Sequence, residues 1–378
     1  MRNLLLLAAT MAVAVLAVST AGQANGVRAN ADPPFATGLN NPRGLTFGPG
    51  GQLYVAEAGD ASQDTMRTDN GTPDPSDDLC AQVGNAGPYT GGNSSRISRI
   101  DPAEPNHPLH PVVSGLPSSA TSPDAGSLVS GVGDVKFLDG QLYGIESGAG
   151  CSHGLQGTHN SLFRVVRIHN TTTTAEVADL SAFQMHHPVA FPNCCDFEPD
   201  GTWYSMVAAR GAIYAVEPNH GEVDRITPQG HITRVVDTSA IVGHVVPTSL
   251  SSHDGRLYFG NLGTFPIVPG HDLIWKVTDD GNLKVVADNL TTVLGTAWDS
   301  RGRLYALEST PVFGFPGADP SGAGKVVRID ANDKQTTVVS GLTTPSAMTF
   351  GPGGALYISN FGFGAPAGAG EILRVEVP

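Results

Sequence analysis

The sequence predicts an all-β protein, a six-bladed β-propeller with four antiparallel strands in each blade. Three observations support this prediction: the composition, a short phrase that occurs six times, and one repeat divided between the two ends of the chain. The 378 residues include 47 Gly and 28 Pro, and only 15 % are charged. This composition is typical of short strands joined by many turns, and sustained helical periodicity is hard to find after residue 20. We therefore expect almost no helix.

Each predicted blade carries the phrase Gly-x-Leu/Ile-Tyr, followed by a basic residue before a β-branched one. The first phrase occurs at 51–54, 140–143, 211–214, 255–258, 302–305 and 354–357. The second occurs at 99–100, 167–168, 225–226, 276–277, 328–329 and 374–375. A further strand precedes the tyrosine phrase, as in RGLTF at 43–47, and another follows the basic one, as in VVSGL at 112–116 and 338–342. Four short strands per unit describe one propeller blade.

The two ends of the chain share one repeat. ATGLNNP at 36–42 matches VSGLTTP at 339–345, and the last unit stops after its third strand. We expect the N-terminal segment to supply the missing outer strand of the last blade and so to close the ring by pairing an open edge. Residues 32–378 then form one propeller, because a four-stranded sheet buries its faces only against neighbouring blades.

Residues 1–31 are typical of a secretory signal peptide with a short leader. A basic start is followed by the apolar run LLLLAATMAVAVLAV and then by small residues, so cleavage could follow Ala24 or Ala31. An uncleaved membrane anchor is the alternative, but we expect a secreted, extracellular monomer with no stable membrane insertion. Removing this segment removes Arg2 and Arg28, so the charge becomes 19 − 35 = −16. Such a surface repels phosphate backbones and disfavours nucleic acid as a partner.

Extra sequence gathers on one predicted rim of the ring. The long loops at 58–94, 102–131, 147–161 and 169–202 either join the second and third strands of a blade or connect one blade to the next, and both kinds open on the same rim. Loops on a rigid scaffold commonly carry binding. We therefore expect this decorated rim to be the functional face.

A polar residue stands three positions after each repeat tyrosine. These residues are Glu57, Glu146, Glu217, Asn261, Glu308 and Asn360. The side chains could converge on a cation, because hard cations prefer carboxylate and carbonyl oxygens. Alternatively, each could accept backbone N–H bonds from its own loop. Arg43 opens the first inner strand and is a candidate anion contact in the central channel or one partner of a structural ion pair.

The four cysteines are candidate disulfide partners because the chain is expected to be exported. They are Cys80, Cys151, Cys194 and Cys195, all placed by the repeat on the decorated rim. Three pairings are possible. The same rim carries Asp69, Asp74, Asp77 and Asp78, a weak calcium candidate that lacks EF-hand spacing. The scattered histidines are expected at surfaces and turns, and no catalytic motif can be identified.

Three longer stretches extend beyond the repeat phrases: ATGLNNPRGLTFGPGGQLYVAEAG at 36–59, GVGDVKFLDGQLYGIE at 131–146 and GLTTPSAMTFGPGGALYISNFG at 341–362. In these stretches the chain resembles the ScyD/ScyE family of secreted propellers. Part of this pattern is shared with NHL-type propellers generally. The resemblance implies a six-bladed exported propeller and no particular chemistry.

Two functional hypotheses follow. In the first, a non-catalytic extracellular binding or scaffold protein holds a small molecule, a glycan or a protein at the decorated rim and needs no cofactor. In the second, a calcium ion over the channel supports hydrolysis, as in the similar gluconolactonase and regucalcin propellers. Convergence of three or four rim acids would favour the second hypothesis, whereas carboxylates turned away from the channel would remove it.

Overall fold

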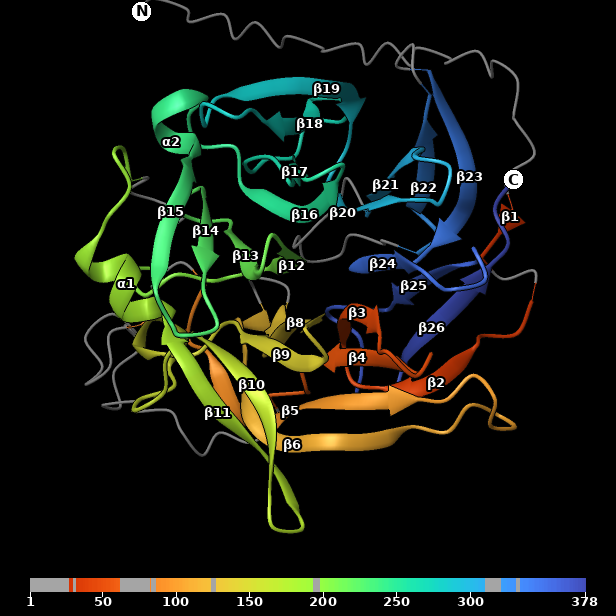
Figure 1. Cartoon of the computed structure of the whole chain (residues 1–378), viewed down its shortest axis with the longest axis horizontal. Helices are drawn as coiled ribbons and strands as arrows, with labels where there is room; N and C mark the ends of the chain where they lie inside the picture. Colours follow the sequence, from red (N-terminus) through yellow and green to blue (C-terminus); the bar gives the residue numbers. More distant parts are fainter. Residues whose placement is uncertain are drawn as a thin grey trace, which may run out of the picture.

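Six antiparallel sheets surround a central axis in the computed structural model of the chain (Figure 1). The structure describes residues 27–29, 32–61, 82, 86–123, 127–192, 198–309, 321–330 and 334–378. Each blade contains four antiparallel strands, and blades 1 and 5 each carry a short fifth strand at the edge. In blades 1 to 5 the four strands run outward from the axis in chain order, whereas in blade 6 the N-terminal β2 (Ala36–Leu39) is the outermost strand. The predicted six-bladed β-propeller is confirmed.

The strands of each blade are given in order from the channel outward. Blade 1 contains β3 (Pro42–Phe47), β4 (Leu53–Glu57), β5 (Thr90–Ile100) and β6 (His110–Ala120), with β7 (Val129–Ser130) at its edge. Blade 2 contains β8 (Val132–Leu138), β9 (Gln141–Glu146), β10 (Ser161–Ile168) and β11 (Thr171–Asp179). Blade 3 contains β12 (Ser205–Ala209), β13 (Ala212–Glu217), β14 (Glu222–Ile226) and β15 (Ile232–Asp237).

The remaining blades follow the same order. Blade 4 contains β16 (Pro247–His253), β17 (Arg256–Asn261), β18 (Asp272–Val277) and β19 (Leu283–Leu290). Blade 5 contains β20 (Val293–Trp298), β21 (Leu304–Glu308), β22 (Gly324–Ile329) and β23 (Gln335–Leu342), with β1 (Val27–Arg28) paired parallel to β23. Blade 6 contains β24 (Ala347–Phe350), β25 (Leu356–Asn360), β26 (Gly370–Val375) and β2 (Ala36–Leu39).

The N-terminal strand closes the ring, as predicted. β2 pairs antiparallel with β26, and Ala36 lies opposite Ile372. Ala36, Leu39 and Ile372 are all buried in one apolar cluster with residues of blade 1. Because the first and last segments of the chain share one sheet, the ring has no open edge between blade 6 and blade 1.

The repeat tyrosines join neighbouring blades, which explains why the phrase recurs. In four of the six interfaces the tyrosine ring contacts an aromatic ring near the end of the next blade's inner strand, with centroids 4.8–5.0 Å apart. These pairs are Tyr54–Phe137, Tyr258–Trp298, Tyr305–Phe350 and Tyr357–Phe47. Tilted and edge-to-face aromatic pairs of this kind add to the stability gained from buried area.

The basic residues of the second phrase lie opposite the tyrosines, except in blade 2. In the other five blades the register pairs each tyrosine with the basic residue predicted from the sequence. In blade 2 Tyr143 pairs with Arg164, whereas Arg167 pairs with Thr172 of β11. The assignment of Arg167 to the repeat was therefore wrong. The β10–β11 hairpin projects from the ring (Figure 1), and Ile168 near its tip is 57 % exposed, so this basic phrase belongs to the projection.

Helix is nearly absent from the described residues, as predicted. The α-helices there are α1 (Leu180–His186) and α2 (Thr238–Ile241), both in connections between blades. Neither is long and apolar enough to cross a bilayer. Three predicted rim loops are partly strand, because β5 begins at Thr90, β6 continues to Ala120 and β11 lies within the 169–202 range. The 147–161 loop contains the short 3-10 helix η3 (Cys151–His153).

Candidate functional site

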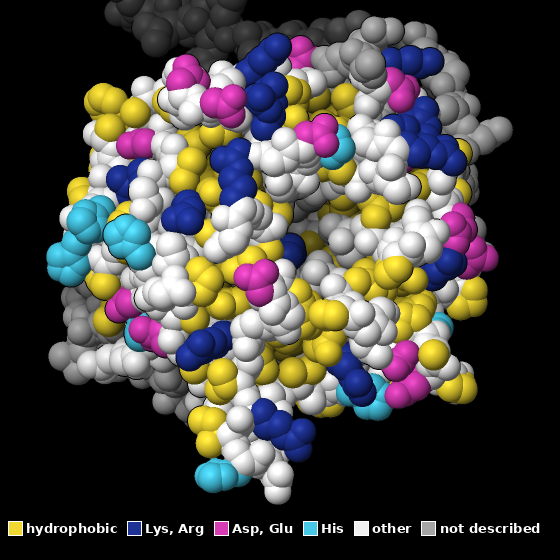
Figure 2. Space-filling model, in the orientation of Figure 1, with side chains coloured by type: hydrophobic (Ala, Val, Ile, Leu, Met, Phe, Trp, Pro, Cys, Tyr) yellow, Lys and Arg dark blue, Asp and Glu magenta, His cyan; other side chains and the backbone are white. Residues whose placement is uncertain are grey.

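A pocket of about 250 Å³ follows the axis of the ring. All six inner strands, β3, β8, β12, β16, β20 and β24, contribute to its wall. Figure 2, viewed along the axis, shows a hollow at the centre of the ring with hydrophobic side chains around it. Because one strand from each blade lines the hollow, the closed ring itself creates the pocket.

An apolar cluster covers the end of the channel on the decorated side. Val246, Leu262, Leu294 and Phe363 are each at most 8 % exposed and pack together with Tyr204. Val246 and Leu294 lie at the starts of the inner strands β16 and β20, and Leu262 and Phe363 follow the second strands β17 and β25. These strand ends face the decorated rim. At the other end Trp298 and Phe350, the last residues of β20 and β24, are partly exposed. The pocket therefore opens among the short turns and away from the decorated rim that we expected to be functional.

Arg43 lies in the pocket near its covered end. Its guanidinium carbon is 6.0 Å from the ring centroid of Tyr204 and 5.8 Å from that of Phe363. Nη2 donates a hydrogen bond to the carbonyl of Val129. Burial lowers the pKa of Arg43, with Tyr204 opposing this effect. Within the described part of the chain no carboxylate forms an ion pair with Arg43, so the structural ion pair considered from the sequence is not observed.

Tyr204 crosses the channel from blade 3 to blade 6. Its hydroxyl donates to the carbonyl of Ser346 at 2.8 Å, and burial raises the pKa of Tyr204 to about 12. Ser346 in turn donates its hydroxyl to the carbonyl of Pro42 in blade 1. These bonds fix the tyrosine ring against Arg43 and connect three blades around the axis.

Asp134 and Lys136 form an ion pair in the wall of the pocket. Lys136 Nζ lies 2.5 Å from Asp134 Oδ1. Asp134 also accepts the backbone N–H of Val135 at 2.7 Å and that of Met206 at 2.9 Å. Burial raises the pKa of Asp134, and Lys136 together with the two amides opposes this effect. Three donors therefore already occupy this carboxylate.

The six polar residues after the repeat tyrosines lie at the ends of the second strands and do not line the pocket. Four of them accept the backbone N–H of a residue that precedes the inner strand of the same blade. These bonds are Asn40 to Glu57 (2.7 Å), Thr202 to Glu217 (2.9 Å), Thr291 to Glu308 (3.1 Å) and Thr343 to Asn360 (2.8 Å). Asn261 instead accepts the N–H of Leu273 at 2.8 Å. The bonds agree with the capping interpretation of this set.

Glu146 differs from the rest of the set. It is buried, its Oε1 has no hydrogen-bond partner among the described residues, and the N–H of Ser147 donates to the carboxyl. Burial therefore raises the pKa of Glu146 well above its ordinary value. A carboxyl group held in this way favours its neutral form.

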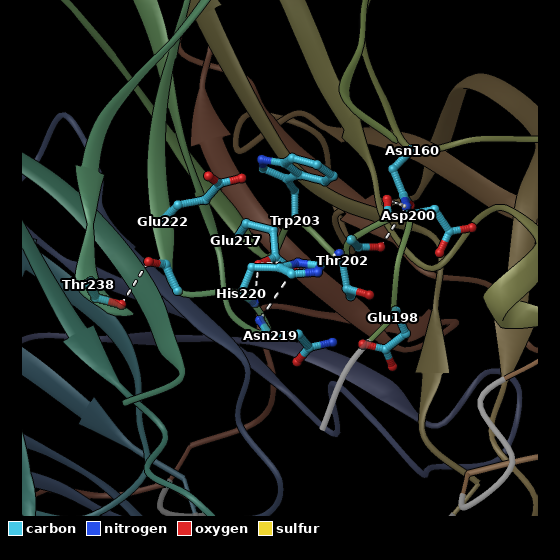
Figure 3. A network of polar contacts seen from close by, with 12 residues as sticks. Asn160, Glu198, Asp200, Thr202, Trp203, Glu217, Asn219, His220, Glu222 and Thr238 are labelled. Carbon is cyan, nitrogen blue, oxygen red and sulfur yellow. Dashed lines mark hydrogen bonds and ion pairs between the residues drawn. The ribbon is translucent and has the colours of Figure 1, made fainter. Parts of the chain in front are cut away.

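Glu217 accepts hydrogen bonds from three residues (Figure 3). In addition to Thr202 it accepts the N–H of Asn219 at 3.2 Å, the N–H of His220 at 2.6 Å and the imidazole of His220 at 3.3 Å. Burial acts to raise the pKa of Glu217, but His220 and the amides together hold it below its ordinary value. His220 and His153 are each 3 % exposed. His220 lies in the turn between β13 and β14, one of the two places expected for histidines, whereas His153 is buried in η3 and departs from that expectation.

Buried hydrogen bonds also fix the rim loop of blade 2 to the segment before blade 3. Asn160 accepts the N–H of Ala149 at 3.0 Å and donates to the carbonyls of Asp200 at 3.0 Å and Gly201 at 2.7 Å (Figure 3). Ser181 donates to the same Asp200 carbonyl at 2.8 Å. In this part of the rim, buried polar side chains and backbone groups therefore form hydrogen bonds with one another.

The rim acids do not converge as a channel-centred calcium ion would require. Each side chain is bound within its own blade, and across the described ranges no three His, Cys, Asp or Glu side chains are grouped to hold a metal. The pocket wall includes one carboxylate, Asp134, which is already occupied. These residues do not fit a calcium ion over the channel.

Several predicted rim residues lie outside the described residues. They are Cys80, Cys194, Cys195, Asp69, Asp74, Asp77 and Asp78. Cys151 lies at the start of η3 and is not a free cysteine. Which cysteine pairs with it stays a prediction.

Sequence reasoning identified Arg43 but missed the residues around it. Tyr204, Asp134 and Lys136 line the same pocket. Arg43 lies three residues before Thr46, which pairs with Tyr54, and Tyr204 lies three residues before Val207, which pairs with Tyr214. Aligning the inner strands of the repeats could therefore have identified Tyr204. The alternation along β8 likewise places Asp134 and Lys136 on one face.

Comparisons with known proteins identify the fold. No family model and no curated protein matches the sequence. A structure of a Bacteroides thetaiotaomicron protein of unknown function has a TM-score of 0.54 and 11 % identity, covering 92 % of this chain and 72 % of that one. A PQQ-bound aldose sugar dehydrogenase from Streptomyces coelicolor has a TM-score of 0.54 and 14 % identity, covering 92 % and 97 %. A putative glucose dehydrogenase from Thermus thermophilus has a TM-score of 0.53 and 15 % identity, covering 91 % and 99 %.

Proposed function

We propose that the protein is an exported, ScyD/ScyE-like propeller that binds a small molecule in its axial pocket. The observation behind this proposal is a pocket walled by all six blades, covered at one end and lined by both apolar and hydrogen-bonding side chains. Concave sites that place polar groups beside apolar side chains are where small ligands usually bind, and serine and threonine residues line this wall together with the apolar ones. A glycan or protein partner at the decorated rim remains a separate prediction.

A large side chain placed in the pocket tests this proposal. Ala347 lines the channel, so Ala347→Trp should fill it, whereas Val268→Trp adds the same side chain to an exposed loop position (Val268 is 47 % exposed). Fragments of neutral, cationic and anionic chemistry are screened by thermal shift, since a ligand at 100 times its Kd stabilises a protein by about 2.7 kcal/mol. Stabilisation should occur with the wild type and Val268→Trp and be lost with Ala347→Trp. Equal shifts in all three proteins would contradict a channel site.

Calcium dependence tests the alternative, a metal-dependent lactonase. Because the rim carboxylates and amides are bound within their own blades, we expect the same melting temperature in excess calcium and in chelator, and no stoichiometric calcium by elemental analysis. A tightly held ion and a large drop in chelator would restore the alternative. Lactone and ester hydrolysis would then be assayed.

A further inference from the structure

We propose that the axial pocket recognises the carboxylate of a small organic acid and that Arg43 is the residue that binds it. This inference rests on the proposed function, since it assigns the chemistry of the ligand that the pocket would take. It concerns the residues at the covered end of the channel, where Arg43 lies between Tyr204 and Phe363.

Arg43 has more donors than the protein uses. A guanidinium carries five N–H groups in one plane. The carbonyl of Val129 accepts one hydrogen bond from Nη2, Tyr204 also interacts with the guanidinium, and the rings of Tyr204 and Phe363 lie about 6 Å from its carbon. The Tyr204 hydroxyl itself donates to Ser346. The guanidinium is thus held in position with N–H groups left for a ligand.

The charge of the pocket favours an anion. Three of the residues that line it are charged: Arg43, Lys136 and Asp134. Lys136 and Asp134 neutralise each other, which leaves the positive charge of Arg43 without a counterion from the described residues. A cation removed from water without a partner is costly, and a bound carboxylate would offset that cost. The chain as a whole carries a net charge of −14, whereas the residues that line this pocket carry a net positive charge.

The shape of the pocket favours a small acid with an apolar body. A carboxylate matches the planar fork of arginine and can accept two parallel hydrogen bonds. Beyond Arg43 the wall combines the apolar residues Leu250 and Met348 with serine and threonine residues, and it ends at Trp298 and Phe350 near the opening. The volume of about 250 Å³ lies below the roughly 300–1,000 Å³ of pockets for drug-sized ligands. An aryl or short alkyl carboxylate, entering with its carboxylate first, fits these features.

Calorimetric titration with matched acids and amides tests the inference. The probes are benzoate, phenylacetate and hexanoate, each compared with its neutral amide. We expect the carboxylates to bind the wild type at least tenfold more tightly than the amides.

Arg43→Met should weaken carboxylate binding by about 10- to 100-fold, in the range expected for a hydrogen-bonded charged group. Arg43→Lys should weaken it less, because an ammonium keeps the charge without the planar fork. The control Arg256→Met, at an exposed arginine beside Asp279, should leave binding unchanged.

The outcomes separate this inference from the proposed function. Equal binding of acids and amides by the wild type would overturn the inference but retain a ligand site in the channel. Unchanged carboxylate binding in a folded Arg43→Met protein would overturn it as well. If neither acids nor amides bind, both proposals fail. Should Arg43→Met not fold, the acid–amide comparison on the wild type and the Arg43→Lys variant still decide the question.

Discussion

Glu57 illustrates how a single buried residue connects three segments of a blade. Its side chain is fully buried and accepts the N–H of Asn40, two N–H groups of Arg96 at 2.7 and 2.8 Å, and the hydroxyl of Ser98. The hydrogen bonds that Arg96 donates to Glu57 raise the pKa of Arg96, against the effect of partial burial. The carboxylate therefore joins the entry to β3, the end of β4 and the adjoining part of β5.

Replacing Glu57 by alanine should destabilise the protein strongly. Removing the carboxylate leaves a buried N–H and a half-buried guanidinium without their partner, and breaking a buried ion pair typically costs about 3–5 kcal/mol. We expect the loss of unfolding free energy to lie near the lower end of this range, since Arg96 is 25 % exposed. Urea denaturation measures it. Glu376→Ala, which removes an exposed partner of Arg374, should cost no more than about 1 kcal/mol. Equal losses would contradict this account.

Asp224 is a buried carboxyl group without a cation in direct contact. Trp203 Nε1 donates to it at 3.4 Å, and the carboxyl of Glu222 on the same strand is its neighbour (Figure 3 shows Trp203 and Glu222). Burial raises the pKa of Asp224 from 3.8 to about 7, with Arg234 opposing this effect. The folded protein therefore keeps this proton up to about pH 7, whereas the unfolded chain releases it near pH 4.

The pH dependence of stability should change when Asp224 becomes asparagine. Between about pH 4 and pH 7 the folded state binds more protons than the unfolded state at this site, so its contribution to stability falls as the pH rises. The Asp224→Asn variant lacks this fall. Its unfolding free energy should be similar to that of the wild type at pH 4 and exceed it at pH 8, by on the order of 1–4 kcal/mol. Denaturation at the two pH values measures the difference, and a parallel pH profile for both proteins would contradict the assignment.

At the scale of strands and blades, aromatic contacts connect one sheet to the next. Tyr54 of β4 meets Phe137 of β8 edge-on at 5.0 Å, and equivalent contacts occur in three other interfaces. The sequence showed that the tyrosines recur, but their partners belong to the following repeat. A pattern within one repeat cannot show which side chain of the next repeat will face it.

A double-mutant cycle should reveal this coupling. Tyr54→Leu and Phe137→Leu are expected to couple by about 0.5–1.5 kcal/mol, the range measured for aromatic pairs. Pairing Tyr54→Leu with Phe350→Leu provides the control, because Phe350 contacts Tyr305 in a different interface. The control cycle should be additive within about 0.5 kcal/mol. Additivity in both cycles would show that the aromatic contact contributes no specific coupling.

Across the whole molecule, both N-terminal strands join the last part of the ring. β2 completes blade 6, while β1 pairs in parallel with β23 of blade 5, where the Ala29 N–H donates to the carbonyl of Ser340 at 2.8 Å. Ala29 is 6 % exposed and packs against a cluster shared by blades 5 and 6. Residues 27–29 therefore cover an outer edge of the propeller.

On the proposal that the chain is exported through a cleaved signal peptide, this packing leads us to predict cleavage after Ala24 rather than after Ala31. Cleavage after Ala24 would retain Val27 and Ala29 in the mature protein, whereas cleavage after Ala31 would uncover the edge of β23. Intact mass and N-terminal sequencing of the exported protein distinguish the two sites. A mature chain that begins at Asp32 would contradict the prediction and show that β1 is dispensable.

The sequence by itself determined the number of blades, the order of strands and the closing role of residues 36–39. The strands within a blade follow from local periodicity, since all strands except β1 and β2 pair with neighbours in sequence. The closing role of residues 36–39 follows from the repeat that they share with residues 339–345. The sequence did not show which arginine of β10 lies opposite Tyr143. Both Arg164 and Arg167 precede a β-branched residue, and the structure pairs Arg164 with Tyr143.

Only the tertiary structure decided where the candidate site lies. Arg43, Tyr204 and Ser346 come from blades 1, 3 and 6, and they meet because the closed ring brings the starts of the inner strands together. The six polar residues after the tyrosines were visible in the sequence, but their hydrogen bonds within each blade were not. Local periodicity determines strands, whereas the convergence of side chains depends on distances across the ring that no stretch of sequence encodes alone.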